Sequence, residues 1–164
     1  MPSSPLRRST LLNILASWKE YIARLSEVSG VDIKDLPSLK EAMRLRIHFF
    51  AENGCRASDH GLDKMVYAKA QESEINALIT RGLSGESITA DEAEPLKTEL
   101  LVFCAKQYAK LGWAMELHMG PMRNNNTLMF NKIGPDTGFD IIGPSDCTRQ
   151  LAQLLNKMYL ADGL

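Results

Sequence analysis

Apolar residues recur at three- and four-residue steps over five stretches of the chain, and this spacing is typical of amphipathic helices. Two of the stretches follow the spacing of a capping box, at Ser38–Glu41 and at Thr89–Glu92. Pro95 predicts a kink or a restart within the fourth helix. The predicted helices span Leu11–Ser29, Ser38–Phe49, Ser73–Gly82, Thr89–Leu111 and Thr148–Tyr159.

Two short apolar runs follow glycines that suit the left-handed position after a helix. They are Cys55–Ser58 after Gly54 and Trp113–Leu117 after Gly112, and a histidine stands six residues beyond each glycine. We interpret both runs as buried strands, with the histidines at the strand ends. Because helices separate the two strands along the chain, we predict that the strands pair in parallel.

The order of these elements predicts an α/β fold that is rich in helices and has about two parallel strands. A closed barrel of eight strand–helix units takes about 250 residues, whereas this chain has 164. We therefore expect residues 1–164 to form a single partial domain. Two strands leave two open edges, which a stable protein covers or pairs, so we expect self-association through these edges or a partner that covers them.

A long segment between Met119 and Cys147 is rich in glycine, proline, asparagine and aspartate. A structureless connection of this length is uncommon in a compact domain unless it has a function. It follows the second predicted strand directly, and in parallel α/β folds ligands bind beyond the carboxyl ends of the strands. We therefore predict a long loop that lines a binding site.

The composition narrows the classes of function. The chain has a net charge of −1 and a pI near 6.3, which gives no basic surface for nucleic acid. Its only early apolar run is short and contains Asn13, so we expect neither a signal peptide nor a membrane span. Three widely spaced cysteines form no C-x-x-C pair, which indicates reduced thiols and a cytoplasmic protein, with no disulfide and no zinc knuckle.

Three residues near the predicted strand ends are candidates for catalysis or binding. Asp59 and His60 place a carboxylate beside an imidazole, an arrangement that suits proton transfer because histidine titrates near neutral pH. His118 holds the corresponding position after the second strand. The alternatives are a cap formed by Asp59 and a hydrogen-bonded core histidine at His118. No H-x-H or H-E-x-x-H pattern is present, so the chain by itself indicates no metal site.

The run Met122–Thr127 is the most unusual of the chain. Arg123 offers a fixed fork of donors for a carboxylate or a sugar oxygen, and Asn124 and Asn125 add amide donors and acceptors for hydroxyls. An asparagine-rich turn is the alternative. The position after a strand end favours a binding loop, whereas Gly134–Asp140 favours a rigid series of turns.

The segments Gly54–Asp63, Gly112–Thr127 and Gly134–Asp140, in this order and spacing, resemble the uronate isomerase family of the amidohydrolase superfamily. The resemblance extends more weakly over the helices from about Trp18 onward. It implies that this chain corresponds to a middle portion of the family's length. It further implies a partial (β/α)8, or TIM, barrel segment, containing about the fifth and sixth strand units.

The family resemblance implies the aldose–ketose isomerisation of hexuronates, glucuronate to fructuronate and galacturonate to tagaturonate. This reaction moves a proton between C2 and C1, so it needs a base near the carbon acid and polar groups around the enediol. By similarity, Asp59 and Arg123 contact the sugar, and His60 and His118 are carried over as neighbouring site residues. The small-molecule partner that the resemblance implies is the hexuronate.

The family also implies a divalent metal such as zinc, whose ligands this chain lacks: the paired histidines after the first strand and the aspartate after the last. The family's Arg-Pro-Asp segment is replaced near the start by Pro5–Arg8. We therefore expect the isolated chain to bind uronate poorly and to turn it over hardly at all. Two other functions stay open, namely a metal-assisted hydrolase on the same barrel and a non-catalytic remnant.

Overall fold

The computed structural model describes residues 18–135, 137–143 and 146–161, and in these residues six helices and four strands follow one another. The part of the first predicted helix that precedes Trp18 lies outside them. The elements are α1 (Trp18–Ser29), α2 (Leu36–Glu52), β1 (Ala57–Leu62), α3 (Glu72–Ser84), α4 (Glu94–Leu111), β2 (Ala114–Met119), β3 (Pro121–Met122), α5 (Thr127–Ile133), β4 (Ile141–Ile142) and α6 (Thr148–Leu160).

The start of α2 differs from the prediction in its capping residue. The Asp35 carboxylate accepts the backbone N–H of Ser38 at 2.9 Å, and the Ser38 hydroxyl in turn accepts the backbone N–H of Asp35 at 3.0 Å. Ser38 is thus the third residue of the box and not its first, and the predicted box at Ser38–Glu41 is wrong. The fourth helix differs similarly, because Thr89 and Glu92 do bond reciprocally but fold a turn before α4 begins at Glu94.

Helix α3 continues past Gly82, where the sequence predicted its end. The left-handed residue that ends it is Gly85, with φ of 89°. Gly82 is glycine for a packing reason instead, because a Cβ there would lie 2.5 Å from the Trp18 ring of α1. This close approach seats α1 against α3.

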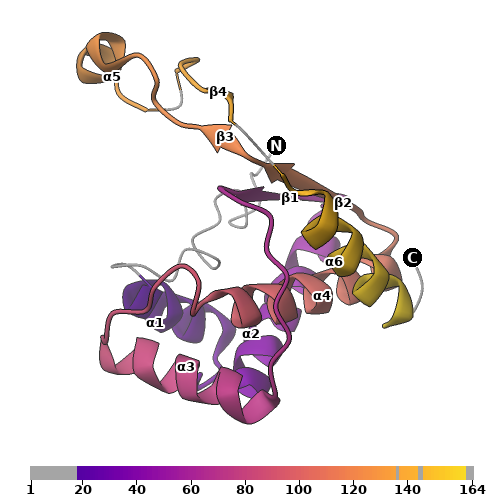
Figure 1. The fold of residues 1–164 in the computed structure, drawn as a ribbon. Helices are drawn as coiled ribbons and strands as arrows, with labels where there is room; N and C mark the ends of the chain where they lie inside the picture. The colour runs from indigo at the N-terminus through magenta and orange to yellow at the C-terminus, as the bar shows by residue number, and fades with distance from the viewer. Residues whose placement is uncertain (1–17, 136, 144–145, 162–164) are drawn as a thin grey trace.

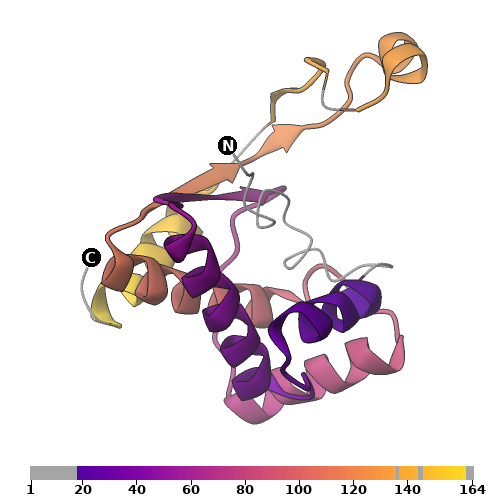
Figure 2. The ribbon, with the colours of Figure 1, turned by 180° about the vertical axis from the view of Figure 1, so that it is seen from behind.

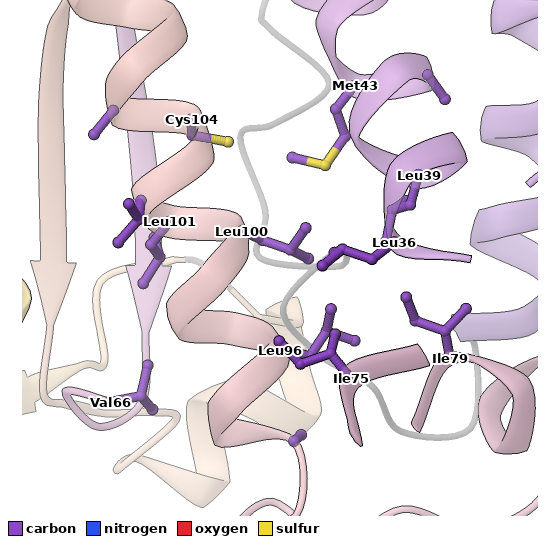
Figure 3. Close-up of a cluster of buried hydrophobic side chains, with 14 of the residues drawn as sticks. Leu36, Leu39, Met43, Val66, Ile75, Ile79, Leu96, Leu100, Leu101 and Cys104 are labelled. Atoms are coloured by element: carbon purple, nitrogen blue, oxygen red, sulfur yellow. The ribbon is translucent and has the colours of Figure 1, made fainter. Parts of the chain in front are cut away.

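Helix α4 is the centre of the core and is buried on more than one side, as expected of a helix whose apolar residues do not form a single stripe. Figure 3 shows Leu96 and Leu100 directed toward side chains of α2 and α3, while Leu101 points away from them. The cluster around α4 contains Leu36, Leu39, Met43, Val66, Ile75, Ile79 and Cys104.

The two main strands pair in parallel, as predicted, from Ala57 opposite Ala114 to Leu62 opposite Met119. Both strands run further than the sequence indicated. The predicted strand Cys55–Ser58 begins too early, because the N–H of Cys55 still donates to the Phe50 carbonyl in the last turn of α2, at 2.9 Å. The prediction also ends too early, because β1 continues to Leu62. The polar residues assigned to strand ends therefore lie within the strands.

The segment after β2 is not the structureless loop that the composition predicted. Strands β3 and β4 pair antiparallel, and α5 forms between them. Asn126 caps α5 by accepting the backbone N–H of Met129 at 3.0 Å. We name residues 120–143 the arm, and Figures 1 and 2 both show it projecting away from the helices.

The arrangement leaves one face of the small sheet without a layer of described helices. In Figures 1 and 2, α2, α4 and α6 lie on one side of β1 and β2, and α1 and α3 pack further away. Predicted and observed helices agree closely for α6, which spans Thr148–Leu160. None of the described helices has both the length and the apolar character needed to cross a bilayer.

Candidate functional site

Alternation along β1 divides its side chains between two environments, because successive residues of a strand point to opposite faces of the sheet. Ser58, His60 and Leu62 are buried. Asp59 lies on the opposite, open face, with 39% of its side chain exposed. In β2 the more exposed positions are Ala114, Glu116 and His118.

The open face brings Asp59 and His118 together. The register places Asp59 opposite Glu116. His118 lies two residues further along β2, opposite Gly61 and on the same face as Glu116. The His118 Nδ1 atom is 3.9 Å from the Asp59 Oδ2 atom. Within the described chain, the other carboxylate oxygen, Oδ1, is buried and has no hydrogen-bond partner. A buried polar atom in this state is one that a ligand or a water donor commonly satisfies.

His60 does not join this pair, which corrects the expectation that both histidines face one site. It is 5% exposed and lies on the buried face, where its Nε2 atom is 3.1 Å from the Ser58 Oγ and 3.2 Å from the Tyr108 hydroxyl. Burial lowers the pKa of His60 to about 4, against the opposing effect of the Asp59 charge. A strand of alternating polar residues does not reveal from sequence which of them is buried.

Arg123 is held by a carboxylate from the far side of the arm. Its guanidinium donates to Asp140 Oδ2 at 2.6 Å, and the backbone N–H of Asn124 donates to Asp140 Oδ1 at 2.9 Å. Asn124 has φ of 57°, a left-handed conformation that asparagine tolerates better than most residues. The Asn124 hydrogen bond, aided by the Arg123 charge, holds the pKa of Asp140 below its ordinary value.

The asparagines after Arg123 have separate structural tasks. The side-chain amide of Asn125 donates to the Met122 carbonyl, and its backbone N–H donates to the Phe139 carbonyl at 2.9 Å. Among the described residues, the side chain of Asn124 has no such bond. The turn interpretation therefore applies to Asn125, whereas the Asn124 amide is available to a ligand.

His118 lies in β2, two residues before the arm begins at residue 120, and is the polar sheet residue nearest in sequence to Arg123. It lies next to Asp59 on the sheet, and its charge also contributes to lowering the pKa of Asp140 in the arm. We define the open-face site as Asp59, His118, Arg123, Asn124 and Asp140. The sequence predicted that Asp140 lies in a rigid series of turns. The pairing of β3 with β4 brings it beside Arg123, from which it is separated by 17 residues in the sequence.

The open-face site does not supply a complete set of metal ligands. A catalytic zinc site uses three protein ligands and an open position. Nowhere in residues 18–135, 137–143 and 146–161 do three or more histidine, cysteine or acidic side chains form a group that could hold a metal ion. The residues described therefore do not fit the metal that the resemblance implies.

These features define a class of protein: an α/β segment of strand–helix units that carries Asp59 and His118 on the open face of a parallel sheet. Comparison with known protein families identifies the family within this class. The glucuronate isomerase profile matches residues 5–164, and the chain belongs to this family.

Individual relatives agree with the family. A uronate isomerase from Clostridium perfringens is 42% identical over 147 residues, which are 90% of this chain and 32% of the relative. The crystal structure of a uronate isomerase from Thermotoga maritima matches with a TM-score of 0.80 at 29% identity, over 92% of this chain and 34% of that one. A glucuronate isomerase from Caulobacter crescentus matches with a TM-score of 0.75 at 30% identity, over 91% and 31%.

The chain thus spans about a third of the length of the relatives that it matches. The match covers nearly all of this chain, so the small sheet and its helices correspond to a segment of the larger fold. The predicted fold class, a helix-rich partial α/β barrel segment, is confirmed at this level.

Proposed function

We propose that this chain supplies part of the active site of a uronate isomerase, which interconverts the aldose and ketose forms of hexuronates. Glucuronate to fructuronate and galacturonate to tagaturonate are the reactions concerned. The observation that carries the proposal is the unpartnered, buried Oδ1 of Asp59 beside His118 on the open face. A sugar hydroxyl is a donor that satisfies such an oxygen.

Asp59 and His118 suit the proton transfer of this reaction. A carboxylate that accepts a sugar hydroxyl orients C1 and C2, and an imidazole 3.9 Å away is a group that accepts or returns a proton. Since the pair lies on neighbouring strands with a fixed register, the two groups are positioned before the sugar binds.

Arg123 suits the carboxylate end of the substrate or one of its hydroxyls. Its guanidinium already binds one carboxylate, that of Asp140, at 2.6 Å. A guanidinium has five N–H donors, so a uronate can share Arg123 with Asp140 or displace it. The side-chain amide of Asn124 then offers a second contact beside the guanidinium.

The open face needs further chain to become an enclosed site. Relatives are about three times as long as this chain, and 39% of the Asp59 side chain and 54% of the His118 side chain are exposed to solvent here, although the Oδ1 atom of Asp59 is buried. Charges in such an open setting are weakened by solvent. The isolated chain is therefore expected to bind hexuronate weakly and to turn it over hardly at all.

The test replaces the 147 aligned residues of the Clostridium perfringens relative with those of this chain. This chimera is expected to form ketose from D-glucuronate or D-galacturonate. The variant Asp59→Asn in the chimera is expected to lower kcat/KM by roughly 100-fold or more. Asp32→Asn, an exposed carboxylate between α1 and α2, is the control and is expected to leave the rate unchanged.

Two results would overturn the proposal. One is a folded chimera, verified by circular dichroism, that forms no ketose. The other is an active chimera in which Asp59→Asn has no more effect than Asp32→Asn. Hydrolysis of lactones or amides by the chimera, without isomerisation, would instead support a hydrolase.

A further inference from the structure

The buried face of β1 carries a polar cluster that the proposed reaction does not use. Ser58 and His60 from the strand meet Tyr108 from α4, and we name these three residues the buried cluster. The Ser58 hydroxyl donates to the Tyr108 oxygen at 3.0 Å, and His60 Nε2 lies 3.1 Å and 3.2 Å from the two hydroxyl oxygens. All three side chains are 5% exposed or less.

Burial lowers the pKa of His60 to about 4, so the imidazole of the buried cluster is neutral near neutral pH. One ring nitrogen of a neutral imidazole donates a hydrogen bond and the other accepts one. Because Nε2 faces both hydroxyl oxygens, the tautomer of His60 is set by its contacts with Ser58 and Tyr108.

The buried cluster holds the backbone on both sides of Asp59, because Ser58 precedes this residue in β1 and His60 follows it. Its partner Tyr108 lies in the last turn of α4, just before β2. The Tyr108 ring stacks on Trp113, with centroids 5.4 Å apart and the planes 15° from parallel, and β2 starts at the next residue. The same side chain therefore contacts β1 and the entry to β2.

Simple burial does not require polar side chains at these positions. Replacing a buried polar network by apolar residues of similar shape is often neutral for stability, whereas removing one member leaves buried polar atoms unpaired. Hydrogen bonds add direction, which fixes one geometry of the packed elements. The geometry fixed here is the alignment of β1 with the start of β2.

We propose that His60 and Tyr108 are positioning residues that hold Asp59 of β1 against His118 of β2 from the opposite face of the sheet. This inference rests on the proposed function and assigns His60 a role that involves no contact with the sugar. Asp59 and His118 on the open face act on the substrate, and the buried cluster sets the distance between their side chains.

The test compares Tyr108→Phe with Thr98→Val. Tyr108→Phe removes only a hydroxyl and keeps the ring stacked on Trp113. Thr98→Val also removes one buried hydroxyl from α4, but this hydroxyl binds the backbone N–H of Ala68 at 3.0 Å and not a strand. In the full 164-residue chain, NMR measures proton–proton contacts between His118 and Asp59 and the 15N shifts of the His60 ring.

Tyr108→Phe is expected to weaken the contacts between His118 and Asp59 and to shift the 15N resonance of His60 Nε2, which loses one of its two hydroxyl neighbours, while Thr98→Val leaves both as in the wild type. In the chimera, Tyr108→Phe is expected to lower kcat by roughly 10- to 100-fold. Its KM should stay within about twofold, because the groups that bind the sugar remain. Ser58→Thr, which keeps a hydroxyl, is expected to retain more activity than Ser58→Ala.

The two readouts separate this inference from the proposed function. Unchanged contacts between His118 and Asp59 in folded Tyr108→Phe would overturn the positioning role, whatever the chimera does. Equal losses of contact in Tyr108→Phe and Thr98→Val would also overturn it, because the effect would then be general loosening of α4. A chimera without isomerase activity, combined with the expected NMR result, would refute only the proposed function.

Discussion

Asp59 and Glu116 are register partners on adjacent parallel strands, so two carboxylates lie side by side on the open face of the sheet. Like charges directly opposite each other destabilise a sheet, and no described group forms an ion pair or a hydrogen bond with Glu116. His118, two residues further along β2, has its Nδ1 atom 3.9 Å from the Asp59 carboxylate. Of the two facing carboxylates, Asp59 therefore has a basic neighbour, whereas Glu116 has none within ion-pair distance among the described groups.

This relationship predicts that Glu116→Gln stabilises the isolated chain at neutral pH. The expected gain in the free energy of unfolding is roughly 0.5 kcal/mol, because one of two facing charges is removed. Urea denaturation of the two single variants and the Asp59→Asn, Glu116→Gln double variant measures it. If the gain from Glu116→Gln persists in the Asp59→Asn background, the two carboxylates do not interact.

The lowered pKa of His60 predicts a specific loss of stability in acid. The pKa is about 4 in the folded chain and 6.5 as the ordinary value, so between these pH values the unfolded chain binds more protons. The free energy of unfolding therefore falls as the pH drops from about 6.5 to about 4, and His60 causes no further change outside that window. Over the whole window the loss of unfolding free energy due to His60 is roughly 3 kcal/mol.

His60→Gln is the matching variant, since glutamine is polar and does not titrate. The difference in unfolding free energy between wild type and His60→Gln is expected to depend on pH between about 4 and 6.5 and to be flat above it. Thermal or urea unfolding at half-unit pH steps gives this difference. A difference that is independent of pH would show that His60 titrates normally in the folded chain.

The sequence was sufficient for the existence of α2, α3, α4 and α6 and for the parallel pairing of the strands, because periodicity and helix-ending glycines are local signals, whereas α5 in the arm was missed. It also predicted that Asp59 and His118 lie close together, and their side chains are 3.9 Å apart. His60 was misplaced because strand alternation assigns faces only after the strand bounds are known. Those bounds depend on the pairing of Ala57–Leu62 with β2, which is a tertiary feature.

Other features of the site depend on contacts that are distant in sequence. The partner of Arg123 is set by the pairing of Met122 with Ile141, and no local signal in either segment indicates it. In the same way, Gly82 has the signature of a helix end, but a tryptophan ring from another helix explains it.

The ion pair of Arg123 with Asp140 predicts different effects of two substitutions in the arm. Arg123→Lys in the chimera is expected to raise KM for hexuronate roughly tenfold, because an ammonium cannot offer the planar fork of donors. Asp140→Asn removes the charge that holds both Arg123 and the Asn124 backbone N–H. It is therefore expected to loosen the arm.

Limited trypsin digestion measures the loosening, because Arg123 and Lys132 are cleavage points within the arm. Asp140→Asn is expected to be cut faster there than the wild type, whereas Asp146→Asn, an exposed carboxylate outside the arm, should not be. Equal cleavage rates for all three proteins would mean that Asp140 does not hold the arm.

Gly82→Ala tests the contact between α1 and α3, where two effects of opposite sign compete. Alanine favours the helix by about 1 kcal/mol over glycine. Its Cβ would lie 2.5 Å from the Trp18 ring, and overpacking of this kind costs about 1–3 kcal/mol. We expect a net loss of stability in urea unfolding, whereas Thr80→Ala, on the exposed side of the same helix, should not lose as much. A net gain in Gly82→Ala would mean that Trp18 moves aside without cost.

Glu99 predicts a larger effect than the exposed ion pairs, because it joins three helices. Its carboxylate binds Lys40 of α2 at 2.8 Å and Lys157 of α6 at 3.0 Å, and its side chain is 25% exposed. Burial raises the pKa of Glu99, but the hydrogen bonds from the two lysines outweigh this and lower it below 4.5. Its contribution to stability is thus present above about pH 4.5 and lost as the pH falls further.

Glu99→Gln is expected to lower the free energy of unfolding at neutral pH by roughly 1–2 kcal/mol, because two partly buried ammonium groups lose their counter-charge. Glu41→Gln, which breaks the more exposed pair with Arg44, is the control and is expected to have little effect. Since α6 follows the arm directly, hydrogen exchange in α6 should also rise in Glu99→Gln. Equal stabilities of the two variants would indicate that α6 is held by its apolar contacts, such as Leu154, and not by Glu99.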